Sequence, residues 1–199
     1  LVVTEPPSER ALNNDQVMTP PSMRVFQTEA IACGFAQSDF CFITPSGPIP
    51  EDASTDSRIN TYMDTQRDDF LQEFTPLAER SKLIVYLGKW AGRPVVGRAI
   101  KITEVRGQIH EHANLPAPVL PLLSAGSILR RPEDADIFKT DFKLAELFKR
   151  GGGTMDGYAE TRLQGKYRWC LDLGEEIDFD NPPKAMALDV EWIGDGSRE

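Results

Sequence analysis

The feature that most constrains the fold is an uninterrupted apolar run in the middle of the chain, Leu83-Ile84-Val85-Tyr86-Leu87. The run is rich in branched side chains and is bounded by Ser81-Lys82 before it and Gly88 after it, as is typical of a strand. A strand with one wet face would alternate apolar and polar residues, and this run does not. It therefore predicts a central parallel strand that is buried on both faces.

Shorter patterns on both sides of this run predict the rest of the fold. Apolar runs at residues 1–4, 40–44 and 118–123 predict further strands. Helical patterns alternate with them at residues 22–33, 64–80 and 132–150, with Pro76 placed to kink or shorten the second helix. Alternation of strands and helices indicates βα units. We therefore expect a three-layer α/β/α fold with a mostly parallel central sheet.

A run of three glycines, Gly151-Gly152-Gly153, interrupts the pattern after the last of these helices. Three consecutive glycines lose too much entropy on ordering to lie inside a helix or strand, so they predict a domain boundary. We expect one domain over residues 1–150 and a linker with a short β extension over residues 151–199. Residues 167–173 and 185–192 are the expected strands of that extension.

Charge and cysteine content limit the possible functions. The net charge of −9 at pH 7 gives no electrostatic basis for non-specific nucleic-acid binding, although Arg130, Arg131, Lys139 and Lys143 could form a local basic patch. The chain has three cysteines without CxxC spacing, which argues against a disulfide framework or a zinc site. Together with the absence of an apolar run long enough to span a membrane, this predicts a reducing, cytoplasmic compartment and no membrane partner.

Four strings carry a family resemblance. They are Val2-Val3-Thr4-Glu5-Pro6-Pro7-Ser8 at the start, the central run 83–88, the turn Val105-Arg106-Gly107, and PVLPLLSAGSILRRPE at residues 118–133. In their order and spacing they resemble motifs of the iron–sulfur branch of the uracil-DNA glycosylase superfamily: VGEAPG, IVALG, an Arg-Gly turn, and PVLPTF followed by HPSYLLR. The resemblance covers residues 1–150 and implies a uracil-DNA glycosylase-like domain.

The resemblance also implies where the catalytic side chains of such an enzyme would lie. Glycosylases flip a base out of the stack and need a group that positions water, together with a donor that stabilises the uracil anion. Glu5 keeps the first carboxylate position, but Ser124 stands where the family has the donor histidine. Pro45 stands where an asparagine would read the uracil edge. Glu5 and Ser124 are therefore degenerate catalytic positions, and glycosylase activity is expected to be lost.

Two further expectations follow from the same resemblance. Iron–sulfur ligation in this branch needs four thiolates, so a chain with three cysteines is expected to carry no cluster. Ser127, Arg130 and Arg131, which follow the position of Ser124, are the expected DNA contacts. The Thr4–Ser8 and Ser124–Ser127 loops should meet at the carboxyl ends of their strands, where open α/β sheets bind ligands.

A second motif lies near the end of the sequence. Ala187-Leu188-Asp189-Val190-Glu191-Trp192 resembles the first motif of the 3′–5′ exonuclease domain of DNA polymerases. Alternation places Asp189 and Glu191 on one face of a strand, where they could hold the Mg²⁺ or Mn²⁺ ions of a complete exonuclease or polymerase. A solvated strand edge is the alternative reading of these carboxylates.

The order of the two motifs resembles the N-terminal region of phage-type family A DNA polymerases. This implies a replication protein of a phage-infected or bacterial host cell, in which a glycosylase-like domain without glycosylase activity binds DNA or other replication proteins. Two alternatives stay open at this point: an active uracil-DNA glycosylase in DNA repair, which would use Glu5 and Ser124, and a stand-alone interaction module.

Overall fold

The computed structural model describes residues 1–162 except 15, 46 and 54. Its centre is a four-stranded, all-parallel sheet with strand order β2-β1-β3-β4. The strands are β1 (Val2–Val3), β2 (Phe42–Ile43), β3 (Ile84–Leu87) and β4 (Val119–Leu122). The expected α/β fold with a parallel sheet is confirmed. Each strand is shorter than its expected range: β3 begins one residue later, and the other three strands lose one or two residues at each end.

The central apolar run forms the strand that the sequence predicts. All four residues of β3 are buried, and β3 lies between β1 and β4, with Val85 in register with Val2 and Leu120. Successive side chains point to opposite faces of the sheet. Val85 and Leu87 therefore join one hydrophobic cluster, and Ile84 and Tyr86 join the other.

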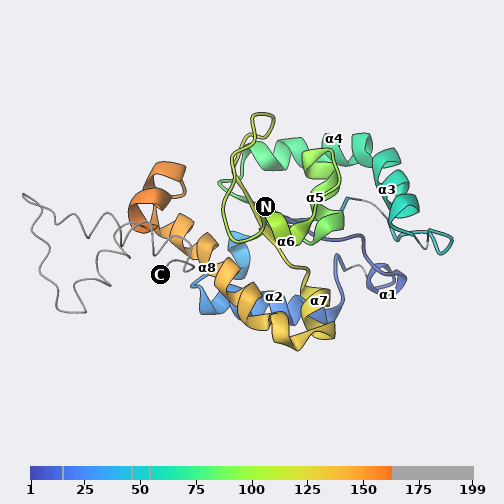
Figure 1. Cartoon of the computed structure of the whole chain (residues 1–199), viewed down its shortest axis with the longest axis horizontal. Coiled ribbons are helices and arrows are strands. Elements are labelled where there is room, and N and C mark those ends of the chain that lie inside the picture. Colours follow the sequence, from blue (N-terminus) through green and yellow to red (C-terminus); the bar gives the residue numbers. More distant parts are fainter. Residues whose placement is uncertain (15, 46, 54, 163–199) are drawn as a thin grey trace, which may run out of the picture. The chain divides into compact units, whose positions relative to one another are not determined.

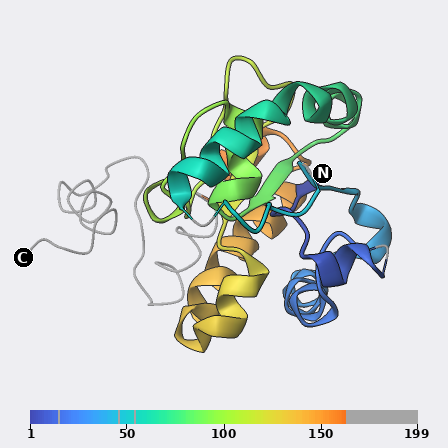
Figure 2. The same ribbon diagram turned by 90° about the vertical axis from the view of Figure 1, so that its right-hand side faces the viewer.

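Helices cover both faces and complete the three layers (Figures 1 and 2). Phe26, Phe138 and Phe142 pack on the face that carries Val85, whereas Phe70 and Phe74 pack on the face that carries Ile84. The helices are α1 (Glu9–Leu12), α2 (Pro20–Ala32), α3 (Asp56–Thr65), α4 (Arg67–Glu79), α5 (Lys89–Val96), α6 (Ile102–Val105), α7 (Ala125–Arg130) and α8 (Ala135–Arg150), with 3₁₀ turns η1 (Gln37–Asp39) and η2 (Pro132–Asp134). Thus α2, α7 and α8 cover one face, and α4 and α5 cover the other.

Two helices differ from the sequence-based expectation. The expected helix at residues 64–80 is α4, which spans Arg67–Glu79 and contains Pro76 without ending there. An additional helix that the sequence did not predict, α3, precedes it and is separated from it at Gln66. The two-helix arrangement buries Met63 from α3 as well as Phe70 and Phe74 from α4. The helix expected to begin at Ser22 begins at Pro20, because a proline at the first helical position loses no intrahelical hydrogen bond.

A buried ion pair joins the chain before β4 to α8. Arg106 donates from Nη1 to Oδ2 of Asp141 at 2.6 Å, and the Asp141 side chain is only 4% exposed. Burial raises the pKa of the Asp141 carboxyl, while the hydrogen bond and charge of Arg106 oppose that rise. The pair therefore compensates a carboxylate that would otherwise be costly inside the protein.

The packed body continues beyond the three glycines. Gly152 and Gly153 have positive φ angles, which turn the chain so that Met155 and Tyr158 pack against the cluster that contains Phe148. The first compact unit accordingly spans Leu1–Ala159, and the second begins at Glu160. The expected strands at 167–173 and 185–192 lie outside the described residues. No helix of the described part of the chain is long and apolar enough to cross a membrane.

Candidate functional site at the carboxyl edge of the sheet

The carboxyl ends of β1, β3 and β4 bring together Glu5, Gly88 and Ser124. Glu5 follows β1, Gly88 follows β3, and Ser124 follows β4, and the middle strand of the three is β3. The Gly88 amide donates to the Leu122 carbonyl at 2.8 Å, which fixes the end of β3 beside the end of β4. The two loops that the sequence expected to meet, 4–8 and 124–127, do meet at this edge, across Gly88.

Gly88 is the residue that allows this approach. Its φ of +90° is a conformation that other residues rarely adopt. A Cβ atom at this position would also overlap the Glu5 carboxylate and lie 3.0 Å from Cβ of Ser124. A side chain at residue 88 would therefore separate Glu5 from Ser124.

The Ser124 hydroxyl is used inside the protein. As the N-cap of α7, its Oγ accepts a hydrogen bond from the Ser127 amide at 3.1 Å. The Ser124 side chain also lies close enough to the Glu5 carboxyl group to lower its pKa. Ser124 thus acts as a helix cap and as a polar neighbour of Glu5.

Ser127 is also engaged within the same turn. Its Oγ donates to the Ser124 carbonyl at 2.6 Å. The hydroxyl proton of Ser127, an expected DNA contact, is therefore used inside the protein. Ser127 can then only accept a hydrogen bond from a ligand. Of the three expected DNA contacts, Arg130 and Arg131 are the exposed side chains.

The Glu5 carboxyl group is withdrawn from water, although the residue keeps some exposed surface. This burial raises the pKa of Glu5 above its usual range. Three groups oppose the rise, in decreasing order: the hydrogen bond from Ser124, the charge of Arg130 and the charge of Lys89. The site therefore holds one carboxyl group whose protonation is favoured, with basic residues on two sides of it.

The end of β2 closes the side of the site next to β1. The Thr44 hydroxyl donates to the Glu5 carbonyl at 3.4 Å. Pro45, which follows Thr44, is buried. The position that the resemblance assigns to a base-reading asparagine thus lies next to Glu5 in space, but it offers no side-chain hydrogen bond.

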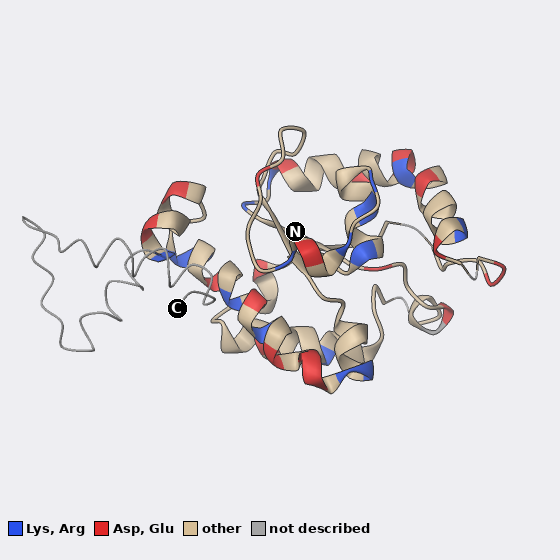
Figure 3. Cartoon of the chain, viewed as in Figure 1, with Lys and Arg blue, Asp and Glu red and all other residues tan. Residues whose placement is uncertain are grey.

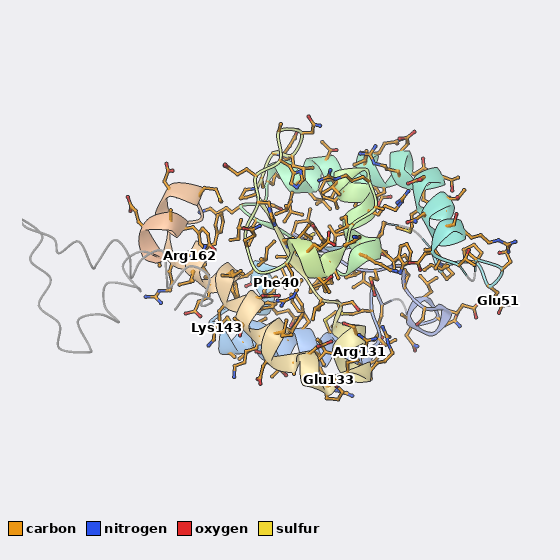
Figure 4. All side chains as sticks on the ribbon, viewed as in Figure 1. Phe40, Glu51, Arg131, Glu133, Lys143 and Arg162 are labelled. Atoms are coloured by element: carbon orange, nitrogen blue, oxygen red, sulfur yellow. The ribbon has the colours of Figure 1, made fainter. Side chains whose placement is uncertain are left out.

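Basic residues surround the carboxyl edge without forming a continuous patch. Lys89 contacts the ring of Trp90, with Nζ 4.3 Å from its centroid, and forms an ion pair with Asp56 at 2.6 Å. Figure 3 shows basic and acidic positions interspersed over the described helices. Figure 4 shows Arg131 and Glu133 close together where α7 leads into the next helical turn. Arg130, whose charge acts on Glu5, and the next residue, Arg131, are exposed, and neither forms a salt bridge within the described ranges.

The remaining expected site residues, the metal ligands Asp189 and Glu191, lie outside the described residues. Cys33 is buried at the end of α2, and Cys41 is exposed just before β2. Within residues 1–162, leaving aside positions 15, 46 and 54, no group of three or more His, Cys, Asp or Glu is placed to hold a metal ion.

Sequence reasoning missed three features of the site: Gly88, Lys89 and the helix-capping role of Ser124. The glycine directly after the central strand was a usable signal, because backbone approaches a ligand or another chain most closely at such positions. The role of Ser124 as an N-cap was also readable, since serine is a preferred cap before a helix.

The fold and the site define an open α/β protein whose polar side chains converge at the carboxyl edge of its sheet. Comparison with models of protein families finds no match, and comparison with curated proteins finds none.

Proposed function

We propose that this chain is the N-terminal region of a DNA polymerase, in which a domain resembling uracil-DNA glycosylases binds DNA without cleaving the glycosidic bond. The observation that carries the proposal is the close approach of the Glu5 and Ser124 side chains across Gly88. It brings together the two positions that the resemblance assigns to catalysis, and neither of them is the histidine that serves as the donor in that family.

The loss of cleavage is argued from the hydrogen-bond inventory. A glycosylase needs a donor aimed at the uracil oxygen that becomes negative in the transition state. Ser124 replaces the donor histidine with a hydroxyl group whose oxygen already caps α7, and Pro45 has no side-chain donor. A carboxyl group with a raised pKa is also a weaker partner for water and for a cationic sugar, because more of it is neutral.

The retained role is argued from position and charge. Open α/β sheets bind ligands at the carboxyl ends of their strands. Arg130, the last residue of α7, is close enough to Glu5 for its charge to act there, and the exposed Arg131 follows it directly. Arginine is the preferred residue for bidentate contact with phosphate. The net charge of −9 opposes binding elsewhere on the chain, so DNA binding should depend strongly on these residues.

Fluorescence anisotropy with labelled single-stranded and primer–template DNA tests the binding role. The double substitution Arg130→Glu and Arg131→Glu should weaken binding and lower its salt dependence, because fewer counterions are released. Lys101→Glu is the matched control, since Lys101 is exposed and lies in the connection after α5. Equal loss in the two variants would contradict DNA binding at the carboxyl edge.

A working glycosylase is the second candidate, and Glu5 is the observation that favours it. Its carboxyl group lies at the edge of the sheet where ligands bind, and a raised pKa is also a property of catalytic carboxyls. This candidate requires the Glu5 carboxyl group to bind water or substrate beside Ser124. Uracil release by the chain separates the two candidates.

A further inference from the structure

A cavity lies at the opposite edge of the sheet, where β1 and β3 begin. Its volume is about 710 Å³, which is within the size range of ligand sites. It is lined by the residues at the start of both strands, by the segment before β2, by the end of α4 and by α8. Glu5, Gly88 and Ser124, which lie at the carboxyl edge, do not line this cavity.

The inner wall of this cavity is aromatic, but its rings are already packed against each other. Phe35 lies 5.4 Å from Phe40 and 6.1 Å from Phe142 between ring centroids. The ammonium group of Lys149 lies over the Phe35 ring, 4.6 Å from its centroid. A nucleobase needs an open ring face on which to stack, and Lys149 occupies that of Phe35. The wall is therefore better suited to an apolar side chain that inserts than to a base that stacks.

The rim of the cavity is basic. Arg80 and Lys82 are both exposed, and their hydrogen bonds go to backbone carbonyls, those of Pro76 at 3.1 Å and Gly152 at 3.4 Å. Neither of them has a carboxylate partner in the part of the chain that the structure describes. The one acidic lining residue, Asp39, is neutralised by Lys149 at 3.0 Å. Two cations are thus available to a ligand that carries negative charge.

We propose that this cavity binds a short acidic peptide segment of a partner protein, which inserts an apolar side chain between Phe40 and α8 and pairs its carboxylates with Arg80 and Lys82. Apolar burial supplies affinity, and the charge complementarity of the rim supplies orientation and rate of association. The site is separate from the carboxyl edge, so the proposal does not depend on DNA binding there.

Fluorescence anisotropy with a labelled Asp-rich peptide that carries one central Phe tests the proposal on the full 199-residue chain. Binding should be lost when the Phe is replaced by Ala or when each Asp is replaced by Asn. The double substitution Arg80→Glu and Lys82→Glu should weaken binding by about tenfold or more. Lys143→Glu, an exposed position on α8 that does not line the cavity, should leave binding unchanged.

Alkylation of Cys41 provides a second measurement that reports position. Cys41 is exposed and lines the cavity, so bound peptide should slow its alkylation, measured by mass spectrometry of the digested protein. Failure of the peptide to bind, or binding that leaves Cys41 alkylation unchanged, would overturn the proposal. Oligothymidine that displaces the peptide from the native chain, and that fails to bind the Arg80/Lys82 variant, would overturn the proposal and identify the cavity as a nucleic-acid site. Loss of DNA binding in the Arg130/Arg131 variant with peptide binding retained would support two separate sites.

Discussion

The side chains of Glu5 and Ser124 lie close together across Gly88, although the two residues are 119 positions apart in the sequence. The contact exists because β1 and β4 both flank β3 and because Gly88 carries no side chain. It links the sheet topology to the chemistry of the site.

Gly88→Ala should lower the free energy of unfolding by more than the cost of placing an alanine at a positive φ angle. The new methyl group would overlap the Glu5 carboxylate, so we expect a loss of about 2–4 kcal/mol in the free energy of unfolding. Gly152→Ala is the control, because Gly152 has a φ of +76° but no atom near its Cβ position. It should cost about 1 kcal/mol. Urea unfolding monitored by tryptophan fluorescence measures both values.

The overlap can be tested within the same series. If Glu5 is the obstructing group, Gly88→Ala should cost less in the Glu5→Ala background than in the native chain. Equal costs in the two backgrounds would show that the carboxylate is not in contact with residue 88.

Glu5 should make stability depend on pH with a defined sign. The pKa of Glu5 is raised in the folded state from its ordinary value of 4.5. The folded protein therefore holds this proton more tightly than the unfolded chain does. The resulting stabilisation is present below pH 4.5 and is lost as pH rises through the folded-state pKa.

Glu5→Gln removes this dependence and serves as the comparison. The free energy of unfolding of the native chain minus that of Glu5→Gln should fall as pH rises through this window. Taking the difference cancels the other carboxyls, including Asp141, whose pKa is also raised. A difference that rises with pH would show that the folded state lowers the pKa of Glu5.

Arg106→Ala should be strongly destabilising. Removing the guanidinium leaves the buried Asp141 carboxylate without its partner, which typically costs about 3–5 kcal/mol. The same substitution in an Asp141→Asn background should cost less, because no buried charge is then left behind. Thermal unfolding of the four proteins of this cycle gives the coupling. Additive losses would contradict a specific ion pair.

The sequence was sufficient to predict the layers of the fold but not the contacts that complete the site. The run at Leu83–Leu87 predicts a buried central strand because such apolar, branched runs seldom form anything else. Helix α3 was not predicted, because Asp56–Thr65 is mostly polar and buries Met63 alone. Glu5 and Ser124 were placed at one edge, but their close approach depends on strand order, which local sequence does not encode.

Asp189 and Glu191 can be tested only in a chain that contains a whole exonuclease domain. If the chain belongs to a DNA polymerase, replacing both by Ala in that polymerase should abolish 3′–5′ exonuclease activity and leave DNA synthesis intact. The reason is that two metal ions need these carboxylates at the scissile phosphate, whereas polymerisation uses other acidic residues. Exonuclease activity on a mismatched primer is the measurement, and unchanged activity would remove the main support for the polymerase proposal.

Release of uracil from single-stranded DNA is the measurement that tests the central claim most directly. Loss of one preorganised donor typically costs about 2.7–4 kcal/mol of transition-state stabilisation. The histidine and asparagine donors that the resemblance implies are replaced here by Ser124 and Pro45. We therefore expect no uracil release above a protein-free control, under conditions in which the same chain binds the DNA. Uracil release that disappears in Glu5→Ala would contradict this account and identify the chain as a working glycosylase.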